Sequence, residues 1–310
     1  MAPQRRTADV KAAQARNFDA LNAVVGTTGF DPHLRFLNYG YAPLPGEEPV
    51  GPKLGPLFPN PDAARMLFQL VGDLDLTDRV VADVGCGRGG NLWLIGRHHQ
   101  PRATIGLDVA ATSVQLVAER VPGAAAILGD AERLPFADAS VDVLVSVETS
   151  CAYPDLDAFL CEAARVLTPG GWLLHSDLLP AEVGRAAVEA LGTEAFDVVT
   201  HRDITANVLA ARSASAARQG SVFDATTAAG ADGGALVAEY LGTERSGFGR
   251  SLADGSRRYR LSRLRRTDRP APARPILDDA LRARAAEGAA ETAELLAPSQ
   301  PPDPDERAAR

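Results

Sequence analysis

The stretch Asp83-Val84-Gly85-Cys86-Gly87-Arg88-Gly89-Gly90 decides the fold of this chain. It follows the apolar run 79–84, which is typical of a buried strand, and precedes a helical segment that begins near Asn91. Glycines at this point let the backbone turn sharply out of a strand and approach a ligand closely. Asp108 ends the next apolar run about 20 residues later, where a carboxylate can accept hydrogen bonds from ribose hydroxyls. The pattern indicates a nucleoside-binding loop.

Short apolar runs alternate with amphipathic segments between residues 62 and 180, which is the pattern of a mainly parallel α/β sheet. Pro169-Gly170-Gly171 is a helix-stop and turn signal that separates the last helix of this region from its last strand. The expected helices start near residue 91 and cover residues 112–121 and 156–167. The expected strands cover residues 79–84, 104–108, 124–128, 141–147 and 172–177.

The flanking segments are less regular. A helix is expected over residues 10–25, and the proline-rich stretch that follows cannot be a long helix. Alternating charged and apolar residues over 257–264 predict a half-exposed edge strand. Beyond residue 269 the chain is rich in Pro, Ala, Arg and Glu, so we expect a flexible tail with one helix over 278–296.

Composition excludes several classes of protein. The 310 residues are 45% hydrophobic and 23% charged, which is ordinary for a globular chain, and the net charge of -8 gives no general attraction for nucleic acid. The three cysteines include no CxxC pair, so we expect neither a disulfide framework nor a metal site. Without a signal peptide or an apolar run of about 18 residues, the expected location is the cytoplasm and no membrane span is expected. A homodimer stays open.

The glycine loop alone leaves alternatives. Gly85, Gly87 and Gly90 also spell the dinucleotide fingerprint, so an NAD(P)-dependent oxidoreductase fits this loop as well. The glycines could serve only a tight turn, and Asp108 could cap the following helix. Asp130, after the third strand, could be a surface turn residue.

Downstream motifs separate these alternatives. The third strand is followed by Gly129-Asp130-Ala131-Glu132-Arg133-Leu134-Pro135-Phe136, in which a carboxylate can accept a hydrogen bond from an adenine amino group. The fourth strand and Arg165-Val166-Leu167-Thr168-Pro169-Gly170-Gly171 come next. This succession, over about residues 60–180, resembles the class I S-adenosylmethionine-dependent methyltransferases.

The resemblance implies a Rossmann-like fold, a mainly parallel seven-stranded sheet with helices on both faces. It implies that Asp83, Gly85 and Gly87 lie beside the methionine part of the cofactor and that Asp108 binds the ribose. Ser146 would face the sulfonium. The full cofactor site that it implies consists of Asp83, Gly85, Cys86, Gly87, Asn91, Asp108, Val109, Asp130, Ala131 and Ser146.

Flanking motifs extend the resemblance to about residues 15–266. Residues 36–41, 203–209 and 258–265 look like segments of small-molecule methyltransferases that act on macrolide sugars, polyketides, related glycosides and mycobacterial lipids. The implied organisation is a lid at 1–60, a methyltransferase domain at 61–268 with a cap inserted at about 181–245, and a tail at 269–310. The implied activity is methyl transfer from S-adenosylmethionine to a small or lipid-like natural product, most often at oxygen. The expected substrate pocket contains Tyr39, Tyr41, Cys151, His201 and Asn207.

One departure concerns the general base. After the fourth strand the family often reads Glu-Ala-Ser-His-Cys-Tyr-Pro, and here the segment is Glu148-Thr149-Ser150-Cys151-Ala152-Tyr153-Pro154. Cys151 replaces the histidine, and a thiol with a pKa near 8.5 is a poor substitute for imidazole. An alcohol acceptor must lose its proton, so we expect the base among His175, Asp177 and Glu148. The missing histidine also keeps open a non-methylating or binding protein on the same scaffold.

Overall fold

The computed structural model describes residues 3–26, 34–55, 58, 60–215, 239, 246–272 and 275–297. This part of the chain contains one sheet of seven strands. Strands near its centre, such as β1, are almost entirely apolar because helices cover both faces of the sheet. The strands are β1 (Val80–Val84), β2 (Ala103–Asp108), β3 (Ala124–Leu128), β4 (Val141–Val147), β5 (Leu167–Pro180), β6 (Phe196–Asp203) and β7 (Arg257–Arg266).

The strand order is β3-β2-β1-β4-β5-β7-β6. Strands β1 to β5 pair in parallel, and β7 runs antiparallel to both β5 and β6. The order reverses between β1 and β4, which pair through Asp83 and Val145. In open α/β sheets, ligands bind at the carboxyl ends of the strands beside such a reversal. The expected fold class is confirmed.

The helices begin where the sequence supplies a cap. Asn60 precedes α2 and accepts a hydrogen bond from Ala63, and Asp155 does the same for α5 through Ala158. A further helical segment covers residues 205–215. The helices are α1 (Pro3–Gly26), α2 (Pro61–Val71), α3 (Gly90–His98), α4 (Ala111–Arg120), η1 (Ser150–Ala152, a 3₁₀ turn), α5 (Leu156–Val166), α6 (Ala181–Glu194), α9 (Gly247–Asp254) and α10 (Asp279–Leu295).

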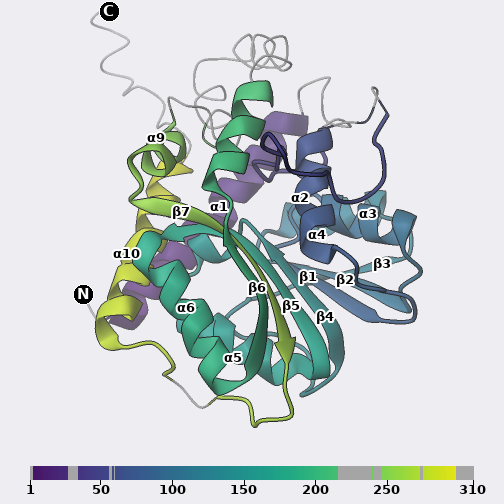
Figure 1. Cartoon of the computed structure of the whole chain (residues 1–310). Helices are drawn as coiled ribbons and strands as arrows, with labels where there is room; N and C mark the ends of the chain where they lie inside the picture. The colour runs from purple at the N-terminus through teal and green to yellow at the C-terminus, as the bar shows by residue number, and fades with distance from the viewer. Residues whose placement is uncertain are drawn as a thin grey trace, which may run out of the picture.

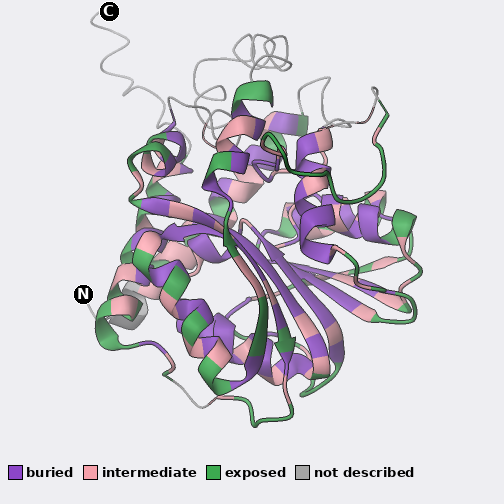
Figure 2. Ribbon diagram, viewed as in Figure 1, coloured by how far each residue is buried: buried purple, intermediate pink, exposed green. Residues whose placement is uncertain are grey.

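The sheet lies between two groups of helices, α2 with α3 and α4 on one side and α5 with α6 on the other (Figure 1). Figure 2 shows that the central strands are buried along most of their length. The core is therefore the sheet together with the inward faces of both helix groups.

Helix α1 packs against α4 and α10, at the carboxyl ends of the parallel strands. Asp19 accepts hydrogen bonds from the backbone and hydroxyl of Thr112, at 3.2 and 2.6 Å. Asn17 donates to the carbonyl of Ala293 at 2.9 Å. These contacts place the N-terminal segment over the edge of the sheet where the glycine loop lies.

The C-terminal expectations need two corrections. The helix predicted over 278–296 is confirmed as α10, but it packs against α1, α5, α6 and β5, so residues 279–295 belong to the folded body rather than to a flexible tail. Strand β7 was expected at an edge, but it pairs with β5 on one side and β6 on the other. Its alternating arginines misled the prediction because long arginine side chains can be buried when backbone carbonyls accept their hydrogen bonds. Arg266 donates in this way to Ala164 and Ala195.

The region between β5 and β7 also differs from expectation. Residues 181–203, predicted as the start of a cap, form α6 and the edge strand β6 of the sheet itself. Segments 216–238 and 240–245 of the predicted cap lie outside the described residues. The turn predicted at residues 169–171 interrupts β5 rather than preceding it. Leu167 pairs with Val141, and the register resumes with Trp172 opposite Val143.

Candidate active site

The glycine loop after β1 has a backbone that other residues adopt only with strain. Gly85, Gly87 and Gly89 have φ angles of +71°, +50° and +77°. A Cβ atom at Gly85 would also lie 1.9 Å from Oγ1 of Thr149. The loop is tied to β2, because the amides of Gly85 and Cys86 both donate to the carbonyl of Leu107, at 2.8 and 3.0 Å. Gly85 is therefore required by both conformation and space.

Asp108 lies at the end of β2, directly beside this loop. Its carboxylate accepts hydrogen bonds from the amides of Gly87 and Ala110, at 2.8 and 2.9 Å. Burial raises the pKa of Asp108 to about 6. The N-cap residue of α4 is Ala110, so Asp108 does not cap that helix with its side chain.

A second carboxyl is buried beneath the loop. Burial raises the pKa of Asp83 to about 7, and the amide of Asn91 is 3.4 Å from its Oδ1. Among the described residues, Oδ2 of Asp83, Oδ1 of Asn91 and Oγ of Ser146 are buried without a hydrogen-bond partner. Buried polar atoms without a partner are rare in folded proteins. These three atoms are therefore suited to hydrogen bonds with a polar ligand that lies beside Asn91.

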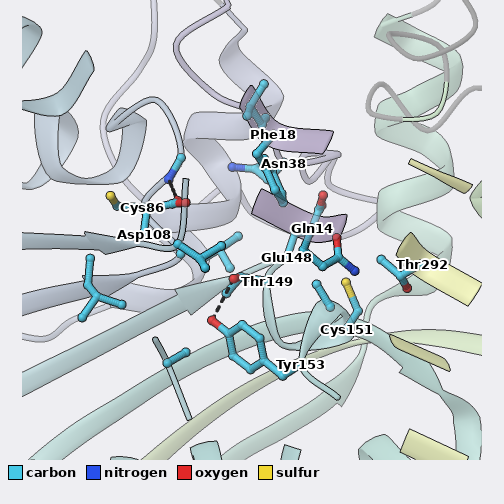
Figure 3. A pocket seen from close by; sticks show the side chains of 18 of the residues that line it. Gln14, Phe18, Asn38, Cys86, Asp108, Glu148, Thr149, Cys151, Tyr153 and Thr292 are labelled. Carbon is cyan, nitrogen blue, oxygen red and sulfur yellow. Dashed lines mark hydrogen bonds between the residues drawn. The ribbon is translucent and has the colours of Figure 1, made fainter. Parts of the chain in front are cut away.

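A cavity opens between the loop, the ends of β2, β3 and β4, and the helices α1, α9 and α10. It encloses about 1200 Å³ including its open mouth. Figure 3 shows Cys86 and Asp108 at one end of this cavity and Gln14, Cys151 and Thr292 toward the other. Of the predicted site residues, those on the cavity wall are Tyr39, Gly85, Cys86, Gly87, Asn91, Asp108, Val109, Asp130, Ala131, Glu148 and Cys151.

Seven predicted site residues are absent from the described wall of this cavity. Tyr41 and Asn207 both donate to Glu47 elsewhere, and Nδ1 of His201, on edge strand β6, is 2.9 Å from Oγ of Ser262. Contrary to expectation, these three side chains do not line the described part of this cavity. The full set away from the wall is Tyr41, Asp83, Ser146, His175, Asp177, His201 and Asn207.

The end of the cavity beside β3 carries an ion-pair cluster. Nζ of Lys11 is 2.7 Å from Oδ2 of Asp130 and also contacts the carboxylate of Glu132. Asp130, expected to recognise adenine, is thus bound in this structure by a cation from α1. This pairing could not be predicted, because 119 residues separate Lys11 from Asp130.

Glu148 follows β4 and is the carboxyl nearest the middle of the cavity (Figure 3). Its φ of +53° is unusual for a residue with a side chain, and such strain is concentrated at functional sites. The carboxylate accepts hydrogen bonds from the Tyr39 amide at 2.5 Å and the Tyr259 hydroxyl at 2.6 Å. Burial raises the pKa of Glu148 to about 8.

Beneath the cavity, Asp177 organises the segment that follows Glu148. One of its carboxylate oxygens accepts hydrogen bonds from the Thr149 amide at 3.0 Å, the Ser150 hydroxyl at 2.7 Å and the Cys151 amide at 3.0 Å. The Ser150 hydroxyl is also 2.8 Å from Nε2 of His175. His175 and Asp177 thus hold η1 from behind, while Cys151 faces the cavity. Burial raises the pKa of the Cys151 thiol, which keeps it protonated.

Several residues of the wall were missed by the sequence analysis. Lys11, Gln14 and Phe18 come from α1, and Thr292 and Leu296 come from α10 or directly follow it. Their spacings of three and four residues place each group on one helix face, which is the only signal that could have found them. Nothing in the sequence says that those faces meet at this cavity.

Two further findings concern metal ions and membranes. The described residues contain no group of three or more His, Cys, Asp or Glu side chains arranged to hold a metal ion. Within the same residues, no helix combines the length and the apolar character that crossing a membrane requires.

Comparisons with known proteins agree with this geometry. A family model described as a methyltransferase domain matches residues 82–175. The chain is 36% identical over 154 residues to phthiotriol/phenolphthiotriol dimycocerosates methyltransferase 1 of Mycobacterium ulcerans (strain Agy99), covering 49% of this chain and 56% of that protein. It is 36% identical over 156 residues to fatty-acid O-methyltransferase of Mycolicibacterium smegmatis (strain ATCC 700084 / mc(2)155), covering 48% and 55%. The chain spans about half the length of these curated relatives.

Solved structures support the fold over a longer part of the chain. Geranyl diphosphate C-methyltransferase from Streptomyces coelicolor A3(2), solved with Mg2+, geranyl diphosphate and S-adenosyl-L-homocysteine, matches with a TM-score of 0.54 at 17% identity. The match covers 81% of this chain and 98% of that one. The family match assigns the glycine loop to a methyltransferase domain rather than to a dinucleotide enzyme. Residues 82–175 therefore match a methyltransferase domain, and the chain has the Rossmann-like fold of the solved geranyl diphosphate methyltransferases.

Proposed function

We propose that this protein transfers a methyl group from S-adenosylmethionine to oxygen of a small or lipid-like natural product. One observation carries the proposal. The Gly85 loop and Asp108 share a single cavity with Glu148, a buried carboxyl that can receive a proton. A methyl donor held by the loop and an acceptor held near Glu148 would therefore meet in the same enclosed space.

The residues of the loop suit this cofactor. Asp108 would accept hydrogen bonds from its ribose hydroxyls, and Asn91, whose Oδ1 has no partner within the described structure, would contact its amino-acid part. The cofactor can approach the backbone closely at Gly87, because an added Cβ there would meet only the Leu37 side chain, at 3.5 Å. S-adenosylmethionine supplies an electrophilic methyl group on a positively charged sulfonium.

Charge on the cavity wall and beneath the glycine loop favours this cofactor over a dinucleotide. The carboxyls of Asp83, Asp108 and Glu148 all have raised pKa values because they are buried. A cationic ligand stabilises their ionised forms, whereas the pyrophosphate of NAD would be repelled by them. The same argument favours the sulfonium form of the cofactor over its neutral product.

Glu148 is the best placed of the three candidate bases. His175 and Asp177 lie behind η1 and contact Ser150, so neither faces the cavity. Glu148 is on the cavity wall and is oriented by the Tyr259 hydroxyl and the Tyr39 amide. In this assignment the acceptor oxygen attacks the methyl carbon while its proton passes to the Glu148 carboxylate. A histidine at position 151, where this chain has Cys151, is then not needed.

The rest of the cavity suits an apolar acceptor. Phe18, Phe36, Leu37, Leu178 and Phe248 contribute apolar surface to its wall. Sites of this kind bury most of a ligand against hydrophobic side chains and fix its orientation with a few polar groups. Relatives named for lipid and fatty-acid methylation support the same class of acceptor.

We also propose a cytoplasmic location, since all three cysteines are free thiols.

The experiment is a transfer assay with S-adenosylmethionine that carries a tritiated methyl group. The protein is incubated with pooled long-chain alcohols, fatty acids and sterols, and radioactivity is counted in the organic extract. We expect labelled product from the wild-type protein and a loss of at least about tenfold in Glu148→Gln. Cofactor binding without transfer to any acceptor would contradict the proposal and favour the non-methylating alternative.

A further inference from the structure

The half of the cavity beyond Glu148, away from the glycine loop, has a distinct chemical character. We define it as the acceptor end, lined by Gln14, Tyr39, Glu148, Cys151, Phe248 and Thr292. Figure 3 shows Gln14, Cys151 and Thr292 on this side and Asp108 on the opposite side. Its residues come from α1, the segment before α2, η1, α9 and α10, and so from parts of the chain that the cofactor loop does not include.

One carboxyl lies on the wall of the acceptor end, and two buried arginines lie behind that wall. Arg212 lies over the Tyr39 ring at 5.8 Å, and Arg257 lies over the Phe248 ring at 5.7 Å and donates to the Leu178 and Gly288 carbonyls. Burial raises the pKa of Tyr39 and of Cys151, so both stay neutral and Glu148 is the group that can ionise. Within the described lining of the whole cavity, the basic residues are Lys11, Arg35 and Arg88. These lie outside the acceptor end and have partners elsewhere: Lys11 pairs with Asp130, Arg35 donates to the Arg120 carbonyl, and Arg88 donates to Asn22.

An anionic acceptor would be poorly stabilised in such a place. It would leave water without meeting a cation on the described wall of the acceptor end, and it would approach the Glu148 carboxylate. Burial of a charge without a partner costs several kcal/mol. The acceptor end is therefore suited to an uncharged molecule.

Hydrogen bonding at the acceptor end is equally one-sided. Nε2 of Gln14 donates to the Ala289 carbonyl at 3.3 Å, and because a carbonyl only accepts, this contact fixes which end of the amide is oxygen. Oε1 of Gln14 is buried without a hydrogen-bond partner in the described structure, and the residue is 3% exposed. The Thr292 hydroxyl already donates its proton to the Gly288 carbonyl, at 2.8 Å.

Gln14, Thr292 and the ionised form of Glu148 thus offer lone pairs rather than protons. A ligand that satisfies them must bring a hydrogen-bond donor, and a carboxylate or a diphosphate brings none. A protonated amine brings donors, but its positive charge would lie close to the sulfonium of the methyl donor. A hydroxyl group meets all of these conditions.

We propose that the acceptor end selects an uncharged, apolar molecule that donates a hydroxyl group to Glu148 and Gln14, and that it discriminates against carboxylates and diphosphates. This inference rests on the proposed function. In the reaction, the hydroxyl oxygen forms a bond to the methyl carbon and the bond from that carbon to sulfur breaks. The products are a methyl ether and S-adenosylhomocysteine, and the hydroxyl proton goes to Glu148.

The test measures binding of three matched ten-carbon probes, 1-decanol, 2-decanol and decanoate, at pH 8. Titrations are run on the protein alone and on the protein with saturating S-adenosylhomocysteine. We expect at least one alcohol to bind about tenfold or more tightly than decanoate in both series, as one or two hydrogen bonds without a charge penalty would give. Absence of S-adenosylhomocysteine binding would contradict the proposed function, while the series on the protein alone still tests the acceptor end.

Two variants assign the selectivity to its residues. Glu148→Gln should reduce the preference for alcohol over decanoate by about tenfold or more, because the repelling charge is removed. Gln14→Leu should weaken alcohol binding by about fivefold to tenfold and leave decanoate binding unchanged. The matched control is Glu119→Gln, an exposed carboxyl on α4, which should leave the preference unchanged. Equal or tighter binding of decanoate, or no binding of either alcohol, would overturn the proposal.

Discussion

Replacing Glu148 by glutamine should make the protein more stable at alkaline pH while it removes activity. The carboxyl is buried, and its pKa is raised to about 8 from an ordinary 4.5, with burial as the main cause. A carboxyl with a raised pKa binds its proton more tightly in the folded protein than in the unfolded chain. Its contribution to stability is therefore complete below pH 4.5 and is lost as the pH rises through 8.

The magnitude follows from that interval. Each pH unit corresponds to about 1.4 kcal/mol, so the wild-type protein should lose about 4 kcal/mol through Glu148 between pH 5 and pH 9. Glutamine cannot ionise, and its amide oxygen can still accept from the Tyr39 amide and the Tyr259 hydroxyl, which both donate to the same oxygen of Glu148. The contributions of Asp83 and Asp108 are the same in both proteins and cancel in the comparison.

The assay is urea unfolding of wild type, Glu148→Gln and the exposed control Glu119→Gln at pH 5, 7 and 9. The variant and the wild type should have similar free energies of unfolding at pH 5. By pH 9 the variant should be more stable by up to about 4 kcal/mol, and the control should follow the wild type at every pH. Parallel pH profiles for wild type and Glu148→Gln would refute the reasoning.

Three further predictions concern the rest of the site. Asp108→Asn should weaken S-adenosylmethionine binding by about 30-fold, which is the effect of losing about 2 kcal/mol of charge-assisted hydrogen bonding. Equal affinities of the variant and the wild type in a calorimetric titration would contradict this prediction. Asp177→Asn should lower kcat about tenfold or more and leave the cofactor Kd unchanged, because Asp177 positions residues 149–151 without touching the cavity. An equal loss of cofactor affinity would argue against that role. Gly85→Ala should lower the free energy of unfolding by about 3 kcal/mol, since its Cβ would lie 1.9 Å from Oγ1 of Thr149. Gly46 has a φ of +89° and no atom within 4 Å of an added Cβ, so Gly46→Ala should lower it by only about 1 kcal/mol. Urea unfolding measures both values.

Local sequence was sufficient for the centre of the molecule. The strands predicted over 124–128 and 141–147 have the observed bounds, and the glycine loop follows β1 as expected. These features depend on residues close together in the chain, such as apolar runs bounded by turn signals. Glu148 was identifiable for the same reason, because it directly follows a predicted strand.

Features that depend on contacts between distant segments could not be predicted. Lys11 meets Asp130 across 119 residues, and the Gln14 amide meets Ala289 across 275. The alternating arginines of β7 looked like a solvent-exposed face, yet Arg257 is buried and donates to the Leu178 and Gly288 carbonyls. Contacts between segments far apart in the chain determine each of these features. The same kind of contact places residues of the predicted tail on the wall of the cavity.

The central claim is that the loop at Gly85 and the carboxyl of Asp108 bind S-adenosylmethionine. Calorimetric titration of the purified full chain with S-adenosylmethionine, S-adenosylhomocysteine and NADH in parallel tests it most directly. We predict micromolar binding of the first two ligands and no heat from NADH, with the sulfonium form tighter because its positive charge is stabilised by the buried carboxyls. Binding of NADH alone, or silence from all three in a protein shown to be folded, would contradict the claim.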